Sequence, residues 1–170
     1  MKKEVEKLLQ YVQKPARYIG GELNAVVKDK DKIDIRYAFC FPDTYEIGMS
    51  HLGMKILYGL VNDREDSWCE RVFAPDNDME EQLRKNNVPL FALESGDYIK
   101  DFDMIGFTLQ YELSYTNVLN MLNLAQIPLK SSDRKNLTPL ICVGGPCACN
   151  PEPITDFVDI VFLGDGEETS

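Results

Sequence analysis

The sequence predicts an α/β fold in which a doubly wound, mainly parallel sheet follows an N-terminal leader helix. Short apolar runs typical of buried strands alternate with segments whose apolar residues recur at helical spacing. Turns containing glycine and proline follow several of these runs, as expected where a parallel strand crosses over into a helix. Of the 170 residues, 44% are hydrophobic, which is enough to fill the core of one compact domain.

The first 32 residues are expected to form the leader helix and a connector, and residues 33–170 the α/β domain. Within residues 2–13 the apolar residues share one helical face, and Pro15 disfavours continuation of that helix. Residues 14–24 form an irregular segment with adjacent glycines, and residues 28–32 a charged turn.

Two βα units are predicted next. The run 33–41 (IDIRYAFCF) indicates a strand and 42–48 (PDTYEIG) a loop, after which a helix is expected from Met49. Its apolar face comprises Met49, Leu52, Ile56, Leu57, Leu60 and Val61. The second unit has a strand at 69–74 and a helix at 78–86, where Asp78 and Glu81 have the spacing of a capping box.

The second half of the chain repeats this pattern. Residues 89–95 could be a short edge strand or a packed loop, whereas 104–109 (MIGFTL) has the continuous apolar character of a strand covered on both faces. A helix is expected after it, with Tyr115, Val118, Leu119 and Leu122 on one face. Further strands are predicted at 140–143 and 159–163. Residues 164–170 (GDGEETS) have the pattern of a turn entering a helix, so we expect the sequence to be truncated there.

Composition excludes several classes of function. The formal net charge is -10, so the segment has no broad basic surface for a nucleic-acid backbone. No apolar run is long enough to cross a membrane and the N-terminus lacks an apolar signal core, which favours a cytoplasmic location. The 5 cysteines are odd in number and irregularly spaced, as expected in a reducing compartment.

Candidate binding residues lie in four loops that follow predicted strands, at 42–48, 110–114, 144–146 and 164–167. Parallel strands bring such loops to one edge of the sheet, where ligands bind in this class of fold. Glycine and proline in each loop alone could simply be turn residues, but together the four loops indicate a ligand crevice. Their glycines match no phosphate-binding motif, and the nearby acidic residues favour a neutral ligand that carries amides.

No catalytic residue is predicted in this segment. His51, the single histidine, is expected to have a structural or hydrogen-bonding role, and the cysteines, including Cys147 and Cys149, are expected to be small buried hydrophobic residues rather than a metal site. Loop carboxylates such as Asp43, Glu46 and Glu112 are expected to be solvated. The loop tyrosines could pack on a large planar ligand or simply in the core or rim.

Several stretches of the chain together resemble a known family. They are KPARYIGGE, AFCFPDTYEIGMSHLGMKILY, CERVFAP, DMIGFTLQYELSYTNVLNML, GGPCACNPEP and FLGDGEE. They resemble the N-terminal part of a bacterial family of radical S-adenosylmethionine (SAM) proteins that have a cobalamin-binding domain and an uncharacterised reaction. The resemblance implies a flavodoxin-like domain here, followed in the parent protein by a barrel-like domain. That domain holds a [4Fe-4S] cluster through Cys-x-x-x-Cys-x-x-Cys and cleaves SAM; the triplet does not occur in this chain.

The resemblance also implies a corrinoid lying across the carboxyl rim of the sheet. The residues expected to contact it are Pro42, Asp43, Thr44, Tyr45, Glu46, Gly48, His51, Thr108, Gln110, Tyr111, Ser114, Gly144, Gly145, Pro146, Gly164, Gly166 and Glu167. Cobalamin proteins that ligate cobalt through histidine use Asp-x-His-x-x-Gly, whereas His51 here lacks the acid two residues before it. Histidine ligation of cobalt is therefore not supported.

The expected function is that of a cobalamin-binding domain of a radical SAM enzyme, which in its full-length form would catalyse methyl transfer or a rearrangement. We expect no turnover by this segment alone, and its partner would be the radical SAM domain of the same parent chain. Two alternatives stay open. One is a ligand-free module for interdomain docking or substrate binding, and the other is a flavodoxin-like binder of another planar cofactor.

Overall fold

The computed structural model describes residues 2–166 and contains a five-stranded parallel sheet with the order β2-β1-β3-β4-β5. Its strands are β1 (Ile35–Phe41), β2 (Ser67–Phe73), β3 (Met104–Thr108), β4 (Leu140–Gly144) and β5 (Ile160–Val161). This order confirms the predicted flavodoxin-like, doubly wound arrangement. The chain moves to one side from β1 to β2 and to the other side from β2 to β3, so the topological switch point lies between β1 and β3.

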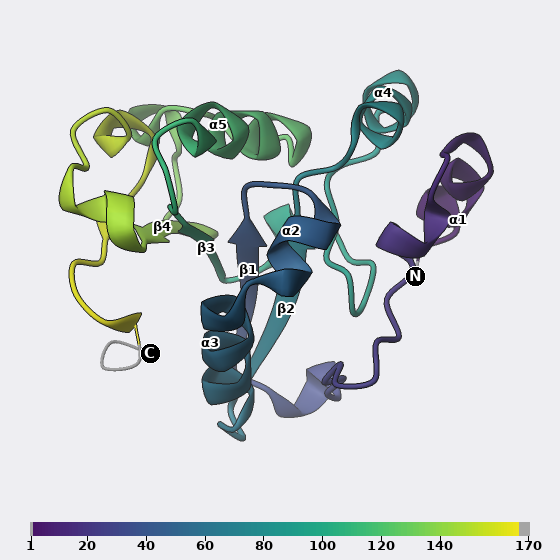
Figure 1. Ribbon diagram of the computed structural model, residues 1–170, viewed down its shortest axis with the longest axis horizontal. Helices are drawn as coiled ribbons and strands as arrows, with labels where there is room; N and C mark the ends of the chain where they lie inside the picture. Colours follow the sequence, from purple (N-terminus) through teal and green to yellow (C-terminus); the bar gives the residue numbers. More distant parts are fainter. Residues whose placement is uncertain (1, 167–170) are drawn as a thin grey trace.

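Helices cover the two faces of the sheet unequally (Figure 1). They are α1 (Lys3–Leu8), α2 (Tyr45–Ser50), α3 (Leu52–Asn62), α4 (Asn77–Asn86) and α5 (Ser114–Leu124). Alternate residues of β1 point to opposite faces, so Phe39 and Phe41 pack with α3 whereas Ala38 and Cys40 join the larger cluster that contains buried residues of α4 and α5. Among the described helices that follow strands, α3 and the short α2 cover the first face, where Gly48 of α2 lies against Phe41 and Phe73.

The N-terminal segment is part of the same core. Val5 and Leu8 of α1 are buried in the cluster that includes α4. The connector contacts α3 and β2 through Val26, whose amide donates to the Tyr58 hydroxyl and whose carbonyl accepts from the Trp68 indole. The ammonium of Lys28 donates hydrogen bonds to three backbone carbonyl oxygens at the end of α3, just after it and at the start of β2, those of Asn62, Arg64 and Ser67. A cation at this position also complements the negative end of the helix dipole.

Several predicted boundaries were wrong. The predicted loop 42–48 contains the start of α2, and Gly48 in that helix is buried against Phe41 and Phe73. The capping box predicted for α4 does not form. Asp76 is the N-cap of this helix, and Asp78 lies inside it, where its side chain accepts a hydrogen bond from the backbone amide of Gln13. β5 is shorter than the predicted strand at 159–163.

The undecided segment 89–95 is a packed loop with an isolated bridge between Phe91 and Tyr98. It covers the free edge of β2: the amide of Leu93 donates to the carbonyl of Arg71 at 2.8 Å, and the amide of Arg71 donates to the carboxylate of Glu94 at 2.7 Å. The exposed hydrogen-bonding groups of an edge strand are thereby satisfied within the chain.

Candidate functional site

The loops after β1 and β3 meet at the switch point and are joined there by side-chain hydrogen bonds. The Tyr111 hydroxyl donates to Asp43 Oδ2 at 2.6 Å, and Asn117 of α5 donates to the carbonyl oxygen of Pro42 at 2.9 Å. Because the carboxylate accepts the phenolic proton, the hydrogen bond from Tyr111 to Asp43 raises the pKa of Tyr111 above its ordinary value. The gap in which flavodoxin-like folds bind ligands is thus bridged by groups of the protein itself.

His51 connects α2 and α3 to the end of β3. Its Nδ1 accepts a hydrogen bond of 3.2 Å from the amide of Met54 and so caps α3. Nδ1 must then be unprotonated, which leaves Nε2 to donate to Gln110 Oε1 at 3.1 Å. Gln110 Nε2 in turn donates to Thr108 Oγ1 at 2.6 Å. Both ring nitrogens are engaged within the protein, as the structural and hydrogen-bonding role predicted for His51 requires.

Two glycines of the predicted site approach other parts of the chain closely. A Cβ atom at Gly48 would lie 2.3 Å from the Phe73 ring. A Cβ atom at Gly145, whose φ is +97°, would lie 2.9 Å from the carbonyl oxygen of Leu109. The turn at Gly145 is held to the end of β3 by the amide of Cys147, which donates to the same carbonyl at 3.1 Å. The chain's own packing therefore requires glycine at both positions.

Other predicted residues point away from the switch point. The Tyr45 hydroxyl donates to Glu22 of the connector at 2.9 Å, and burial followed by this bond raises the pKa of Tyr45 to about 12. Glu46 accepts a hydrogen bond of 2.8 Å from Arg17, which lowers the pKa of its carboxyl. Ser114, in contrast, is buried at the start of α5, and its hydroxyl donates to the carbonyl oxygen of Tyr111 in the loop after β3 at 2.6 Å.

The remaining predicted residues lie at the ends of β1, β4 and β5. Thr44 is the N-cap of α2, Gly144 is the last residue of β4, and Gly145 and Pro146 form the turn after it. Gly166 lies against α3, where a Cβ atom would come within 3.1 Å of Leu57. Gly164 has no atom within 4 Å of its Cβ position, and Glu167 lies outside the described residues.

The rim presents apolar side chains and carboxylates to solvent. Leu113 is 81% exposed, Leu163 is 64% exposed and Tyr111 is 39% exposed. Gly145 and Pro146 are exposed beside them. The loops 42–44, 109–113 and 144–150 contain carboxylates at Asp43 and Glu112 but no lysine or arginine. We call this surface the ledge. It consists of the apolar or uncharged residues Tyr111, Leu113, Gly145, Pro146 and Leu163 and of the acceptors Asp43 and Glu112.

The cysteines differ in exposure. Cys40, Cys69 and Cys142 are buried, and burial raises the pKa of the Cys142 thiol to about 11. The expectation of a buried residue was wrong for Cys149, which is exposed and whose thiol donates to the carbonyl of Pro146 at 3.1 Å. Within residues 2–166, no group of three or more histidine, cysteine or acidic side chains has the geometry of a metal site.

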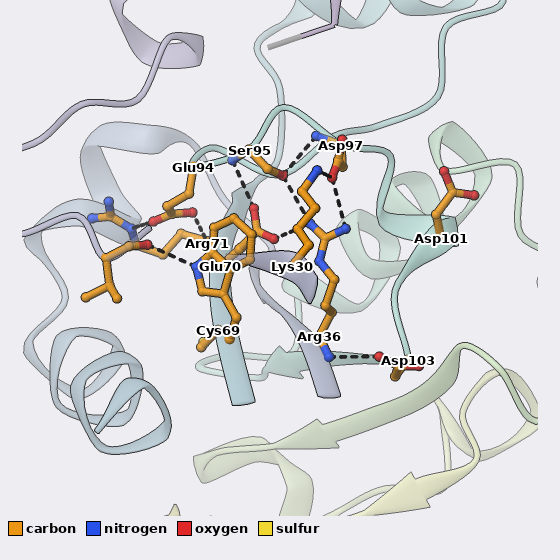
Figure 2. A network of polar contacts seen from close by, with 12 residues as sticks. Lys30, Arg36, Cys69, Glu70, Arg71, Glu94, Ser95, Asp97, Asp101 and Asp103 are labelled. Atoms are coloured by element: carbon orange, nitrogen blue, oxygen red, sulfur yellow. Dashed lines mark hydrogen bonds and ion pairs between the residues drawn. The ribbon is translucent and has the colours of Figure 1, made fainter. Parts of the chain in front are cut away.

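A buried polar network lies along β2, away from the rim (Figure 2). Arg36 of β1 pairs with Glu70 and Asp97, and Asp97 also accepts a hydrogen bond from Lys30. The side chains of Glu70 and Glu94 are 0% exposed. This network was not predicted from the sequence, although the charged residues inside the run CERVFA could have indicated it.

Arg71 forms the second part of this network. It pairs with Glu94 at 2.6 Å and with Glu22 at 2.9 Å, and its guanidinium lies over the Tyr58 ring. These pairs bind the connector and the segment that covers the sheet edge to β2. The network therefore has a structural role in holding three segments together.

Two hollows in the surface lie away from the rim. A cavity of about 20 Å³, the size of one water molecule, is lined mainly by apolar residues and lies between β2 and α4. A depression of about 220 Å³ lies between the carboxyl ends of α4 and α5. None of the residues that line either hollow belongs to the predicted site.

None of the helices within residues 2–166 is long and apolar enough to cross a membrane.

Comparisons with known proteins relate this chain to larger ones. Residues 53–170 match the family described as radical SAM proteins, N-terminal. An uncharacterized protein of Methanocaldococcus jannaschii is 28% identical over 131 residues, which are 76% of this chain and 24% of that relative. The chain thus spans about a quarter of the length of the curated relative it matches. No solved structure matches it.

Proposed function

This chain belongs to the family of N-terminal regions of radical SAM proteins, and from that premise we propose that it is the cobalamin-binding domain of a radical SAM enzyme. The [4Fe-4S] cluster and SAM would be held by another part of the parent protein. The observation that carries the proposal is the ledge at the switch point, where apolar groups and carboxylate acceptors occur without a lysine or arginine. Such a surface suits a ligand with broad apolar faces and a fringe of amides better than a phosphorylated ligand.

The residues at the ledge fit a corrinoid held from one side. The Tyr111 ring and Leu113 would pack against the macrocycle, and the acceptors at Asp43 and Glu112 would take hydrogen bonds from its amides. Because both ring nitrogens of His51 are hydrogen-bonded within the chain, this histidine would hold its loops in place and would not ligate cobalt. When bound, cobalamin supplies methyl-transfer or rearrangement chemistry, and this chain would position it against the parent protein's other domain.

A ligand-free docking module is the second candidate, and two observations favour it. The hydrogen bond between Tyr111 and Asp43 bridges the switch point, and the close approaches at Gly48 and Gly145 are made by the chain's own atoms. In this case the ledge would pack directly against the radical SAM domain. The exposed apolar residues would then be covered by protein rather than by a cofactor.

Titration with hydroxocobalamin separates these candidates. We expect saturable binding, followed by corrin absorbance and equilibrium dialysis. Leu113→Glu should weaken it at least about tenfold, because a buried carboxylate beside the macrocycle would have to be desolvated. Leu137→Glu is the matched control, since Leu137 is 76% exposed but lies before β4, away from the rim. Absence of uptake at tens of micromolar would favour the docking module, and uptake of flavin instead would assign another planar cofactor.

A further inference from the structure

α3 carries apolar residues on the side that faces away from the sheet. Leu52 is 69% exposed, Ile56 is 41% exposed and Leu60 is 40% exposed. Successive helical residues turn by about 100°, so this row lies opposite the residues that α3 buries against the sheet, such as Tyr58. Figure 1 shows α3 in front of the sheet. The outer sides of helices ordinarily carry polar residues, so the outer side of α3 has the composition of a contact surface.

Gly59 lies on the same outer side of the helix. Seven residues make almost two full turns, so Gly59 points in nearly the same direction as Leu52. Glycine inside a helix is less favourable than alanine because its backbone loses more freedom on folding. Apart from the backbone of α3 itself and the two neighbouring residues, no atom within residues 2–166 lies within 4 Å of a Cβ atom placed at Gly59. The chain's own packing therefore does not require glycine here, whereas close approach of a second backbone would.

Two opposite charges lie at equal distances from Gly59 along the helix. Lys55 comes four residues before it and Asp63 four residues after it, and both residues are exposed. Neither forms an ion pair within residues 2–166, whereas the neighbouring Arg64 is paired with Asp66. A second copy of this helix that ran in the opposite direction and crossed at Gly59 would lie with its Asp63 level with Lys55. The charge pattern of the outer side is thus complementary to itself.

We propose that the outer side of α3 is a dimer interface that binds a second copy of this chain in antiparallel orientation. The surface consists of Leu52, Lys55, Ile56, Gly59, Leu60 and Asp63. A two-fold axis at Gly59 uses the same surface on both copies, as is usual in homodimers. Leu60 of one copy would then lie level with the interval between Ile56 and Leu60 of the other, and pairs of Lys55 with Asp63 would flank this apolar contact.

The self-complementary charges select a second copy over an unrelated partner, because a partner of another sequence would have no reason to match both ends of the helix symmetrically. The proposal goes beyond cofactor binding and does not depend on it, since the argument uses no residue of the ledge. A failure to bind cobalamin would therefore leave the tests of the dimer unaffected.

Sedimentation equilibrium of the 170-residue chain tests the interface. Salt at about 0.15 M is needed, because each copy has a net charge of -10 and this ionic strength limits the repulsion to about 8 Å. We expect a concentration-dependent equilibrium between monomer and dimer. Ile56→Glu should weaken the dimer at least about tenfold, since its carboxylate would be buried in the contact, whereas the exposed control Leu137→Glu should leave it unchanged. A monomer at all concentrations up to about 1 mM, or equal effects of the two variants, would overturn the proposal.

Charge reversal tests the antiparallel orientation. Lys55→Asp and Asp63→Lys should each weaken the dimer at least about threefold, because each places like charges opposite one another. The double variant should associate within about twofold of the native chain, because opposite charges again face each other across the two-fold axis. Losses that simply add in the double variant would contradict this orientation.

Cross-linking at Gly59 tests the position of the axis. Gly59→Cys is made together with Cys149→Ser, which removes the exposed native thiol. Glutathione disulfide would oxidise the two introduced thiols to one disulfide and be reduced to two molecules of glutathione. We expect at least about fivefold more covalent dimer than from Leu137→Cys with the same Cys149→Ser change, because only the first pair of thiols would face each other. Equal yields from the two variants would overturn the crossing at Gly59.

Discussion

The hydroxyl of Tyr111 donates a hydrogen bond of 2.6 Å to Oδ2 of Asp43 and thereby joins the loops that follow β3 and β1. These strands flank the topological switch point. The contact therefore determines how far the two loops can separate, whether a cofactor or another domain lies above them. The pKa of Tyr111 reports the strength of this hydrogen bond, because a carboxylate acceptor stabilises the protonated phenol.

Asp43→Asn should shift the ionisation of Tyr111 to lower pH. The hydrogen bond accepted by Asp43 is the first cause of the raised Tyr111 pKa, followed by burial and the negative charge of Asp43. NMR titration of ring-labelled tyrosine would follow this change. Glu112→Gln is the control, since it removes a neighbouring charge and leaves the Asp43 hydrogen bond in place. An unchanged Tyr111 titration in Asp43→Asn would contradict the contact.

Gly145→Ala should destabilise the fold by about 1–3 kcal/mol, because the new methyl group would lie 2.9 Å from the Leu109 carbonyl oxygen at a φ of +97°. Urea unfolding would measure the loss. Gly164→Ala is a matched control: its φ is +115°, but no atom lies within 4 Å of the Cβ position. Equal losses in the two variants would assign the effect to backbone strain alone and contradict the role of the Leu109 contact.

The order of strands and helices could be predicted from the sequence because apolar periodicity reports local burial. The run at β3 is apolar throughout since helices or connecting segments cover both of its faces, and the apolar positions of α3 recur at helical spacing. The short helix α2 was missed because Gly48 and Ser50 are weak helix formers. Its position depends on the packing of Gly48 against Phe73, a contact between separate elements.

The candidate site was predictable only to the level of loops. Parallel topology brings the ends of β1 and β3 together, so the segments at the rim followed from strand order. The hydrogen-bond partner of each side chain could not be predicted from strand order, because the partners are far apart in the sequence. Asp43 and Tyr111 are separated by 68 residues, and His51 and Gln110 by 59. Sequence spacing also could not show that Tyr45 and Glu46 point toward the connector rather than the switch point.

Glu94→Ala should destabilise the protein by about 3–5 kcal/mol, because it would leave the guanidinium of Arg71 buried with one carboxylate fewer. Glu94→Gln should cost less, since its amide oxygen can still accept hydrogen bonds from Arg71. Denaturant unfolding would rank the variants. Glu80→Ala removes a partly exposed pair with Arg84 and a hydrogen bond from Asn120, and should cost only about 1–2 kcal/mol. Similar losses in Glu94→Ala and Glu80→Ala would show that the buried pair is not structural.

Asp97→Asn should make the protein less stable at neutral pH and less sensitive to acid. Burial opposes ionisation of Asp97, but hydrogen bonds from Lys30 and Arg36 outweigh it and lower the pKa of this carboxyl. A lowered folded-state pKa contributes stability that is present above the unfolded value of about 4 and is lost as the pH falls through the folded value.

The free energy of unfolding of Asp97→Asn should therefore be about 1–2 kcal/mol lower than that of the native protein at pH 7. The difference is no larger because the contacts of Asp97 with Lys30 and Arg36 are only partly shielded from solvent, and it should narrow below about pH 4. Unfolding in urea at a series of pH values would measure this difference. Asp133 lies at an exposed position between α5 and β4, so the free energy of unfolding of Asp133→Asn should change with pH in the same way as that of the native protein. If the free energy of unfolding of Asp97→Asn differed from that of the native protein by the same amount at pH 7 and at pH 3, Lys30 and Arg36 would not be holding this carboxylate in its ionised form.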